Sequence, residues 1–420
     1  MLASCKKWVD YNPREDFRIT ELDYLASESD YRTMVVSVYT PLQWINQVVP
    51  IGDIASDNAV SGGENASDVL ALQQIDDYSH TPVNSALTEI WSSAYEGVNR
   101  ANYMTQYKDN NPAGKTVDFA GKDALYGEVY FIRAYYYFTL VKMFGDVPLF
   151  VDRRLGLTDS KTLQRSPKAE VYAQIEKDLQ EAIAKLPGNQ SQKGRVTRFA
   201  AQALLGKVYL YQDKFAQAAS TFEEVIGVYS LVNDFGQLFE EEGENGPESV
   251  FEIQYTNKSN WYDWGFTPQG TEGNFGIIHN GIRAFNGPKY ASGWSFNVPT
   301  QKLVDSYEAG DQRKAATILD IKAFAQQTGA TYAEGYKHTG YFNQKYMPRA
   351  GQSGAQIELN YGTNYRAIRY ADVLLMAAEA QNRGGLSDAK AQQYLNQVRR
   401  RALGSSVQPI TATGSALTEL

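Results

Sequence analysis

Apolar residues recur at helical spacing through the middle of the chain, and this pattern constrains the fold more than any other feature. Residues 122–144 show it most clearly, with Leu125, Val129, Ile132, Tyr136, Leu140 and Phe144. Residues 169–186 repeat the pattern and end at Pro187-Gly188, a helix stop. Residues 84–107 are expected to pair with 122–144. The sequence therefore predicts a mainly α-helical fold.

Two stretches read as helical hairpins. In 197–226, small residues such as Ala200, Ala203 and Ala218 lie where two helices must approach closely. This stretch resembles one tetratricopeptide repeat, whose unit has about 34 residues. Residues 366–382 and 386–402 form a second such hairpin. We predict an irregular α-solenoid of tetratricopeptide-like hairpins, an architecture that usually serves as scaffold or docking surface.

The helical pattern fades between residues 228 and 365, where Gly and Pro recur and aromatic residues gather with Asn and Gln. Short strands are predicted at Ser249–Tyr255 and Tyr341–Met347. A loop-rich insertion of this size is usually functional. We predict a tether over 1–20, a helical region over 21–227, a loop-rich ligand-binding region over 228–365, and a C-terminal helical hairpin over 366–420. Residues 46–70 are a further candidate loop.

Composition excludes several classes of protein. The chain of 420 residues has 40 Lys+Arg against 48 Asp+Glu, a net charge of −8, which argues against nucleic acid as the main partner. One cysteine excludes a disulfide framework and a Cys-rich metal site. The 29 tyrosines provide more aromatic surface than a core of this size requires.

The single cysteine lies in Leu2-Ala3-Ser4-Cys5, which has the form of a bacterial lipobox. In that case Cys5 is the lipidated first residue of the mature protein. The alternative is an ordinary free or buried thiol. No apolar run of 18 residues occurs, so no transmembrane helix is predicted.

The sequence contains no recognisable catalytic motif. His80, His279 and His338 are far apart, lack metal-ligand spacing and are predicted to lie on the surface or in loops. Gly351–Gly354 lacks the strand and helix that flank a nucleophile elbow. Asp53, Asp57 and Glu64 offer a weak calcium possibility, but their spacing differs from a helix-loop-helix calcium loop. We therefore expect no catalytic residue, no metal and no cofactor.

A series of ordered motifs resembles the SusD/RagB family. The central one is Gly127-Glu128-Val129-Tyr130-Phe131-Ile132-Arg133-Ala134, followed by Gly145-Asp146-Val147-Pro148-Leu149. Others flank it in family order: Trp91…Tyr95…Asn99-Arg100-Ala101-Asn102, Ala203-Leu204-Leu205-Gly206-Lys207-Val208-Tyr209-Leu210, Gly293-Trp294…Pro299-Thr300, Gly310-Asp311-Gln312-Arg313, Ile368-Arg369-Tyr370-Ala371-Asp372, and Leu395-Asn396-Gln397-Val398-Arg399-Arg400-Arg401-Ala402. The resemblance spans nearly the whole chain.

The resemblance implies a lipoprotein of the Gram-negative outer membrane that faces the exterior and is held by a lipid anchor. It implies a glycan ligand and, as partner, a SusC-like TonB-dependent transporter, with no catalysis. It also implies four tetratricopeptide-like hairpins that support a loop-rich ligand face. The family pattern continues past Leu420 with a further helix, so this chain looks truncated. Lys6 and Lys7 replace the acidic run associated with surface export.

Sugar binding requires flat aromatic faces and planar polar groups. The densest such group is Asn260-Trp261-Tyr262-Asp263-Trp264-Gly265-Phe266, in the loop-rich region. The predicted ligand-binding residues are Trp261, Tyr262, Trp264, Trp294, Tyr290, Asn274, Arg283 and Trp44. Core packing is the competing interpretation for each tryptophan. Trp91, on a helical stripe, and the Arg133 helix and Asp146 turn are predicted to be structural.

Three other functions stay open from the residues alone. A relative that captures peptides would have fewer stacked aromatic residues and more arginines that bind carboxylates. A glycoside hydrolase needs only two carboxylates, which spacing cannot exclude. A docking scaffold would bind no soluble polysaccharide.

Overall fold

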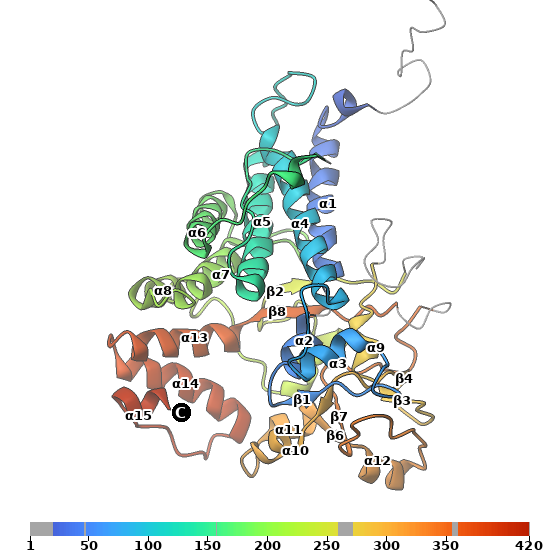
Figure 1. Cartoon of the computed structure of the whole chain (residues 1–420). Coiled ribbons are helices and arrows are strands. Elements are labelled where there is room, and N and C mark those ends of the chain that lie inside the picture. Colours follow the sequence, from blue (N-terminus) through green and yellow to red (C-terminus); the bar gives the residue numbers. More distant parts are fainter. Residues whose placement is uncertain (1–19, 46–47, 157, 259–271, 355–359, 420) are drawn as a thin grey trace, which may run out of the picture.

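The computed structural model describes residues 20–45, 48–156, 158–258, 272–354 and 360–419. Helices predominate within these ranges, and the strands are short and pair only in twos (Figure 1). None of the described helices combines the length and the apolar character needed to cross a bilayer.

The elements have the following bounds. The α-helices are α1 (Glu28–Trp44), α2 (Val48–Ile54), α3 (Leu70–Asp76), α4 (Ser85–Gln106), α5 (Lys122–Phe144), α6 (Lys168–Lys185), α7 (Arg198–Leu210), α8 (Phe215–Glu223), α9 (Gly276–His279), α10 (Gln301–Asp305), α11 (Gln312–Thr317), α12 (Ile321–Thr328), α13 (Tyr370–Arg383), α14 (Asp388–Leu403) and α15 (Gly414–Thr418). The 3₁₀ helices are η2 (Glu21–Asp23), η3 (Asp159–Lys161), η4 (Phe235–Phe239) and η5 (Glu241–Gly243). The strands are β1 (Ala59–Val60), β2 (Ser249–Ile253), β3 (Ile282–Arg283), β4 (Ser292–Gly293), β5 (Val298–Pro299), β6 (Ile318–Asp320), β7 (Tyr341–Asn343) and β8 (Tyr365–Arg369).

The helical predictions are confirmed with one correction. Helix α5 covers the predicted 122–144 and packs between α4 and α6, while α7 with α8 and α13 with α14 form the two hairpins. The helix predicted from residue 366 begins instead at Tyr370. Residues 365–369 alternate between buried and half-buried, the period of a strand, and form β8. The fold is therefore an irregular array of tetratricopeptide-like hairpins.

A buried arginine joins the first hairpins. Arg133 on α5 donates from Nε and Nη2 to the two carboxylate oxygens of Asp178 on α6, at 2.8 and 2.7 Å. Its Nη1 donates to Asn102 Oδ1 on α4 at 2.9 Å. Both members of the ion pair are almost completely buried. Two of the motifs noted in the sequence therefore meet in the core as scaffold, as predicted.

The tight turn after α5 is also structural. Gly145 has φ = 69°, a left-handed conformation that a residue with a side chain rarely adopts. Asp146 Oδ1 accepts a hydrogen bond from the backbone N–H of Lys168, the first residue of α6, at 2.8 Å. The turn thus fixes where α6 begins.

Strand β2 pairs with β8 in antiparallel fashion and connects the helices to the loop-rich region. On its helical side, the Phe251 ring contacts Phe131 of α5 edge to face, with 5.0 Å between centroids. The strand predicted at 249–255 is confirmed over Ser249–Ile253, and that predicted at 341–347 over Tyr341–Asn343.

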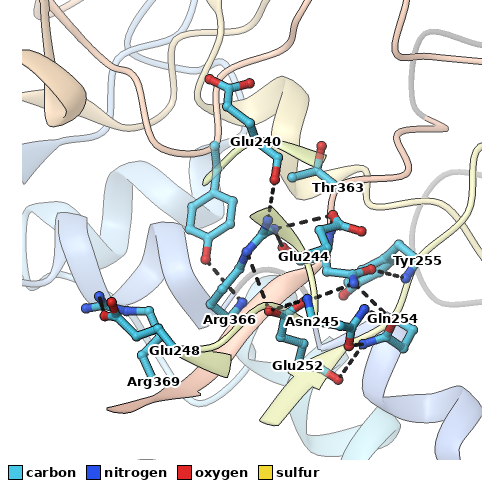
Figure 2. Close-up of polar contacts among 12 residues, drawn as sticks. Glu240, Glu244, Asn245, Glu248, Glu252, Gln254, Tyr255, Thr363, Arg366 and Arg369 are labelled. Atoms are coloured by element: carbon cyan, nitrogen blue, oxygen red, sulfur yellow. Dashed lines mark hydrogen bonds and ion pairs between the residues drawn. The ribbon is translucent and has the colours of Figure 1, made fainter. Parts of the chain in front are cut away.

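Arg366 of β8 lies at the centre of a buried polar network (Figure 2). Its Nη2 donates to the carbonyl of Glu240 at 2.6 Å, and its Nη1 donates to the carbonyl of Asn364 at 2.5 Å. Its guanidinium also forms ion pairs with Glu244 at 3.4 Å and with the fully buried Glu252 at 3.9 Å. One side chain therefore holds β8, β2 and the 240–244 segment together.

Glu244 is the member of this network whose charge is most perturbed. Its carboxylate accepts from the backbone N–H of Asn364 at 2.7 Å. Desolvation nevertheless raises the pKa of Glu244 from 4.5 to about 7, because the hydrogen bond and Arg366 offset only part of the burial. The network thus contains a carboxyl group that titrates near neutral pH.

We predict that Arg133→Met lowers the free energy of unfolding by about 3–5 kcal/mol, because it leaves the Asp178 carboxylate buried without its partner. Urea denaturation followed by circular dichroism measures the change. The double variant Arg133→Met/Asp178→Leu removes both charges and should lose less. A loss below about 1 kcal/mol in the single variant would contradict the assignment.

We predict that the stability of the protein contains a component from Glu244 that falls as pH rises from about 4.5 to about 7. In this window the folded protein retains a proton that the unfolded chain has released, so rising pH favours unfolding. Glu244→Gln should remove this component in urea titrations at pH 5 and pH 7.5. Glu242→Gln, at an exposed position two residues away, is the control. Equal pH slopes for wild type and Glu244→Gln would refute the prediction.

Candidate functional site

The densest aromatic cluster of the sequence lies in 259–271. The residues that flank this segment are hydrogen-bonded to each other, and we call them its base. The backbone N–H of Thr256 donates to the carbonyl of Glu272 at 2.9 Å, which joins the residues on either side of 259–271. Trp261, Tyr262 and Trp264 lie within 259–271 and so outside the described residues. The structure describes the residues on either side of this segment, which form its base.

The residues that flank a second segment, 355–359, lie beside this base. The side-chain amide of Asn257 donates to the carbonyl of Gln352 at 3.0 Å. The backbone N–H of Gly354 donates to the carbonyl of Asn360 at 3.1 Å, which closes the base of 355–359. The two bases are therefore hydrogen-bonded to each other.

Glycines allow this close approach. A Cβ on Gly273 would lie 2.0 Å from the side-chain oxygen of Asn360, and one on Gly354 would lie 2.5 Å from the carbonyl oxygen of Asn257. Both distances are too short for any real side chain. The two glycines therefore have a steric role at the base.

The bases are bonded to the buried network around Arg366. The side chain of Asn364 accepts from the backbone N–H of Tyr255 at 2.9 Å and donates to Glu252 and Gln254, each at 3.1 Å. One residue thus fixes the strand that leads into 259–271. Sequence reasoning did not select Asn364 or the surrounding 352–364. The Asn and Gly residues of 351–364 were the available signal, but the sequence prediction covered only Gly351–Gly354, as a segment that lacks the flanks of a nucleophile elbow.

A hollow of about 200 Å³ opens beside this base, between α1, the 192–195 loop and β2. Its walls include the side chains of Gln43, Arg195, Gln254 and Glu272. Gln43 is fixed, because its amide donates to the carbonyl of Gln254 at 2.8 Å. Amide, guanidinium and carboxylate groups of this kind can bind the hydroxyls of a sugar.

Of the other predicted ligand residues, Trp44 is placed in the core. It is 5% exposed at the end of α1, and the guanidinium of Arg100 lies 5.1 Å from its ring centroid. This arrangement leaves no ring face for a sugar. The adjacent Gln43 and Asn46 suggested a binding loop, but α1 extends to Trp44 and buries it.

Tyr290 and Asn274 are also buried, at 3% and 5% exposure. Tyr290 packs against Phe285 and Phe324 and donates from its hydroxyl to Gln344 Oε1 at 2.8 Å. Asn274 donates from its amide to the carbonyl of Thr363 at 2.9 Å. Both side chains are therefore engaged within the protein, and Asn274 supports the base of 259–271 rather than facing a ligand.

Trp294 and Arg283 are brought together, as expected from the sequence. Arg283 Nη2 donates to the carbonyl of Trp294 at 2.8 Å and to Asp68 Oδ2 at 3.0 Å. Asp68 belongs to the candidate loop 46–70, so Arg283 links that loop to Trp294. The Trp294 ring is half-buried and contacts His279, with 5.3 Å between centroids.

His279 is buried beneath Trp294, which corrects its prediction as a surface or loop residue. It ends the short helix α9 and contacts Phe275 and Phe296. Burial lowers the pKa of His279 to about 4, so the imidazole stays neutral at physiological pH. Its surroundings are aromatic, which fits a packing role better than acid–base chemistry.

The weak calcium possibility is not supported. The described residues contain no group of three His, Cys, Asp or Glu side chains placed to hold a metal ion. Asp53 accepts from the side-chain amide of Asn297 at 2.8 Å, and Asp57 pairs with Lys302. The carboxylates of the 46–70 loop are thus directed to different partners instead of to one point.

Comparisons with known proteins agree with this architecture. Residues 7–210 match a family described as "Starch-binding associating with outer membrane", and residues 319–414 match the SusD family. A SusD-like protein P2 of Formosa agariphila is 28% identical, over 96% of this chain and 79% of that protein.

Solved structures give the same result. A laminarin-binding SusD-like protein is 35% identical, with a TM-score of 0.82 over 94% of this chain and 87% of that one. Surface glycan-binding protein A from Bacteroides thetaiotaomicron, solved with laminarihexaose, is 27% identical, with a TM-score of 0.80 over 94% and 86%. The matching family models, the 35% identical structure and the helical hairpins agree, and this chain belongs to the SusD/RagB family.

Proposed function

We propose that this protein captures glycan at the cell surface and passes it to a SusC-like TonB-dependent transporter, without catalysis. The observation that carries the proposal is the aromatic sequence Trp261–Trp264, in a segment whose base is fixed to a rigid fold. The laminarin and laminarihexaose named for two similar proteins support a glycan ligand and make laminarin the first candidate.

In the proposed binding mode, aromatic rings contact the faces of the sugar and polar side chains bind its hydroxyls. Trp261, Tyr262 and Trp264 supply flat rings against which the C–H faces of sugar rings pack, at small entropic cost because aromatic side chains have few rotatable bonds. The polar hollow beside the base supplies hydrogen bonds from Gln43 and Arg195. A fixed base matters because ordering a free segment on binding would weaken affinity. Trp294 is a further contact, through its exposed part.

The same proposal assigns the location of the protein. Cys5 carries a lipid anchor in the outer membrane, and the ligand face points to the exterior. A protein with several acyl chains is held much more firmly than one with a single chain. Transfer of glycan to the transporter then needs no diffusion away from the membrane.

We predict that Trp261→Ala/Trp264→Ala abolishes retention by laminarin in affinity electrophoresis. Loss of aromatic stacking at about 1–3 kcal/mol per ring, by analogy with stacked bases, lowers affinity at least tenfold. The matched control is Tyr78→Ala, which removes a 70% exposed aromatic residue outside this region. Circular dichroism checks that each variant is folded.

Three outcomes would contradict the proposal. Unchanged retention of the double variant would exclude these rings as the binding surface. Release of reducing sugar from laminarin by the purified wild type would exclude a purely binding function. Failure of the wild type to bind any polysaccharide, combined with binding of peptides, would favour the peptide-capturing alternative.

We predict that Cys5→Ser moves the protein from the outer-membrane fraction to the soluble fraction and removes incorporation of labelled fatty acid, because serine cannot form the thioether of the anchor. Lys6→Ala, one residue away, is the control and should stay membrane-bound. Protease treatment of intact cells tests outward orientation. Continued membrane association of Cys5→Ser with full labelling would refute the anchor.

A further inference from the structure

A larger pocket lies between α1, α4 and the 152–156 loop. Its volume is about 950 Å³, at the upper end of the range of small-ligand pockets, about 300–1,000 Å³. None of the ligand residues predicted from the sequence lines it. Its chemistry therefore needs a separate explanation.

The walls of this pocket are held in place by hydrogen bonds. Asn99 of α4 accepts from the backbone N–H of Leu155 at 2.7 Å and donates to the carbonyl of the same residue at 3.3 Å. Gln106, at the end of α4, accepts from the backbone N–H of Arg154 at 3.1 Å. The loop that closes the pocket is thus attached to α4 at two points, and the pocket is preformed.

The lining combines balanced charge with aromatic rings. Two carboxylates, Glu21 and Glu96, face two guanidinium groups, Arg100 and Arg154. Glu96 pairs with Arg100 at 2.8 Å. An ionic ligand would therefore meet repulsion as well as attraction. A neutral ligand with many hydroxyls can accept hydrogen bonds from the guanidinium groups and donate to the carboxylates.

Arg154 and Tyr24 are the groups best placed for such a ligand. Arg154 is exposed, stacks over the ring of Tyr103 at 5.4 Å, and forms no ion pair among the described residues. Its N–H groups remain available, and the ring beneath holds the guanidinium plane in position. Tyr24 is 44% exposed at the rim and offers an aromatic surface for a sugar ring.

The pocket and the smaller hollow beside the aromatic segment share helix α1. Val36, Thr40 and Gln43, at helical spacing, face the smaller hollow. Met34 and Ser37 face the larger pocket. The two sites therefore lie on different faces of one helix.

We propose that the pocket between α1 and α4 is a second carbohydrate-binding site, for a neutral oligosaccharide. This inference rests on the proposed glycan-binding function. Two sites on one helix would let a single polysaccharide chain bind twice. The second contact would be intramolecular and would raise the retention of long chains above that of short ones.

Isothermal titration calorimetry of the whole chain with laminarihexaose tests the proposal. The wild type should bind two hexasaccharides, and Tyr24→Ala/Arg154→Met should bind one. The same double variant should reduce retention by laminarin polymer at least tenfold. The matched control Tyr78→Ala/Arg198→Met changes the same residue types outside the pocket, and should behave as wild type. Arg198 is exposed and lies over the ring of Phe199 at 5.1 Å, as Arg154 lies over Tyr103.

The outcomes separate the two proposals. If the wild type binds one hexasaccharide and the Tyr24/Arg154 variant retains laminarin normally, the second site is refuted while the proposed function stands. If the Trp261/Trp264 variant still binds one hexasaccharide and the Tyr24/Arg154 variant also binds one, both sites are established. If the Trp261/Trp264 variant binds as wild type does, the aromatic site is refuted. If the wild type binds neither laminarihexaose nor laminarin, both proposals fail for this glycan.

Discussion

The rest of the structure depends on the buried guanidinium of Arg366, at the β2–β8 ladder, which forms an ion pair with the buried carboxylate of Glu252. Burying a guanidinium is costly unless it is paired and hydrogen-bonded, so the groups that bind it are held in place. Here those groups include the carbonyls of Glu240 and Asn364. The same network holds the residues that flank 259–271 and 355–359. A second carboxylate joins the C-terminal hairpin to this ladder. Glu248 accepts hydrogen bonds from Arg369 of β8 and from Arg401 of α14.

In this arrangement the helical hairpins form the rigid core, and the loop-rich region provides the proposed binding surface. The helical hairpins carry the core, where Arg133 links α4, α5 and α6. The loop-rich region has smaller buried clusters of its own, such as Phe285, Tyr290 and Phe342, and also contains the aromatic sequence that we propose binds glycan. A glycan-binding protein benefits from such a division, because sugar contacts are shallow and individually weak, and a fixed base reduces the entropy lost on binding. The polar hollow beside the base and the pocket on the other side of α1 extend the available surface.

Periodicity predicted the helices because their burial repeats locally: in α6 the buried residues Val171, Ile175 and Leu179 recur at every fourth position. It missed β8, since a five-residue strand directly followed by a helix gives too short a signal. Trp44, Tyr290 and Asn274 were expected at a ligand because of their polar, loop-like neighbours. Their burial comes from residues distant in sequence, such as Arg100 against Trp44 and Gln344 against Tyr290. A single sequence does not encode those contacts in any local pattern. Arg283 and Trp294 are brought into contact, and lie within one short segment, while their role at a ligand stays a prediction.

The central claim is that glycan binds to 259–271, the segment flanked by the hydrogen bond between Thr256 and Glu272. Hydrogen–deuterium exchange of the whole chain, with and without saturating laminarin, tests it most directly. The account predicts slower exchange in peptides that cover residues 256–273, with the hairpin α13–α14 unchanged. Slower exchange confined to that hairpin, or no change anywhere despite measured binding, would contradict it.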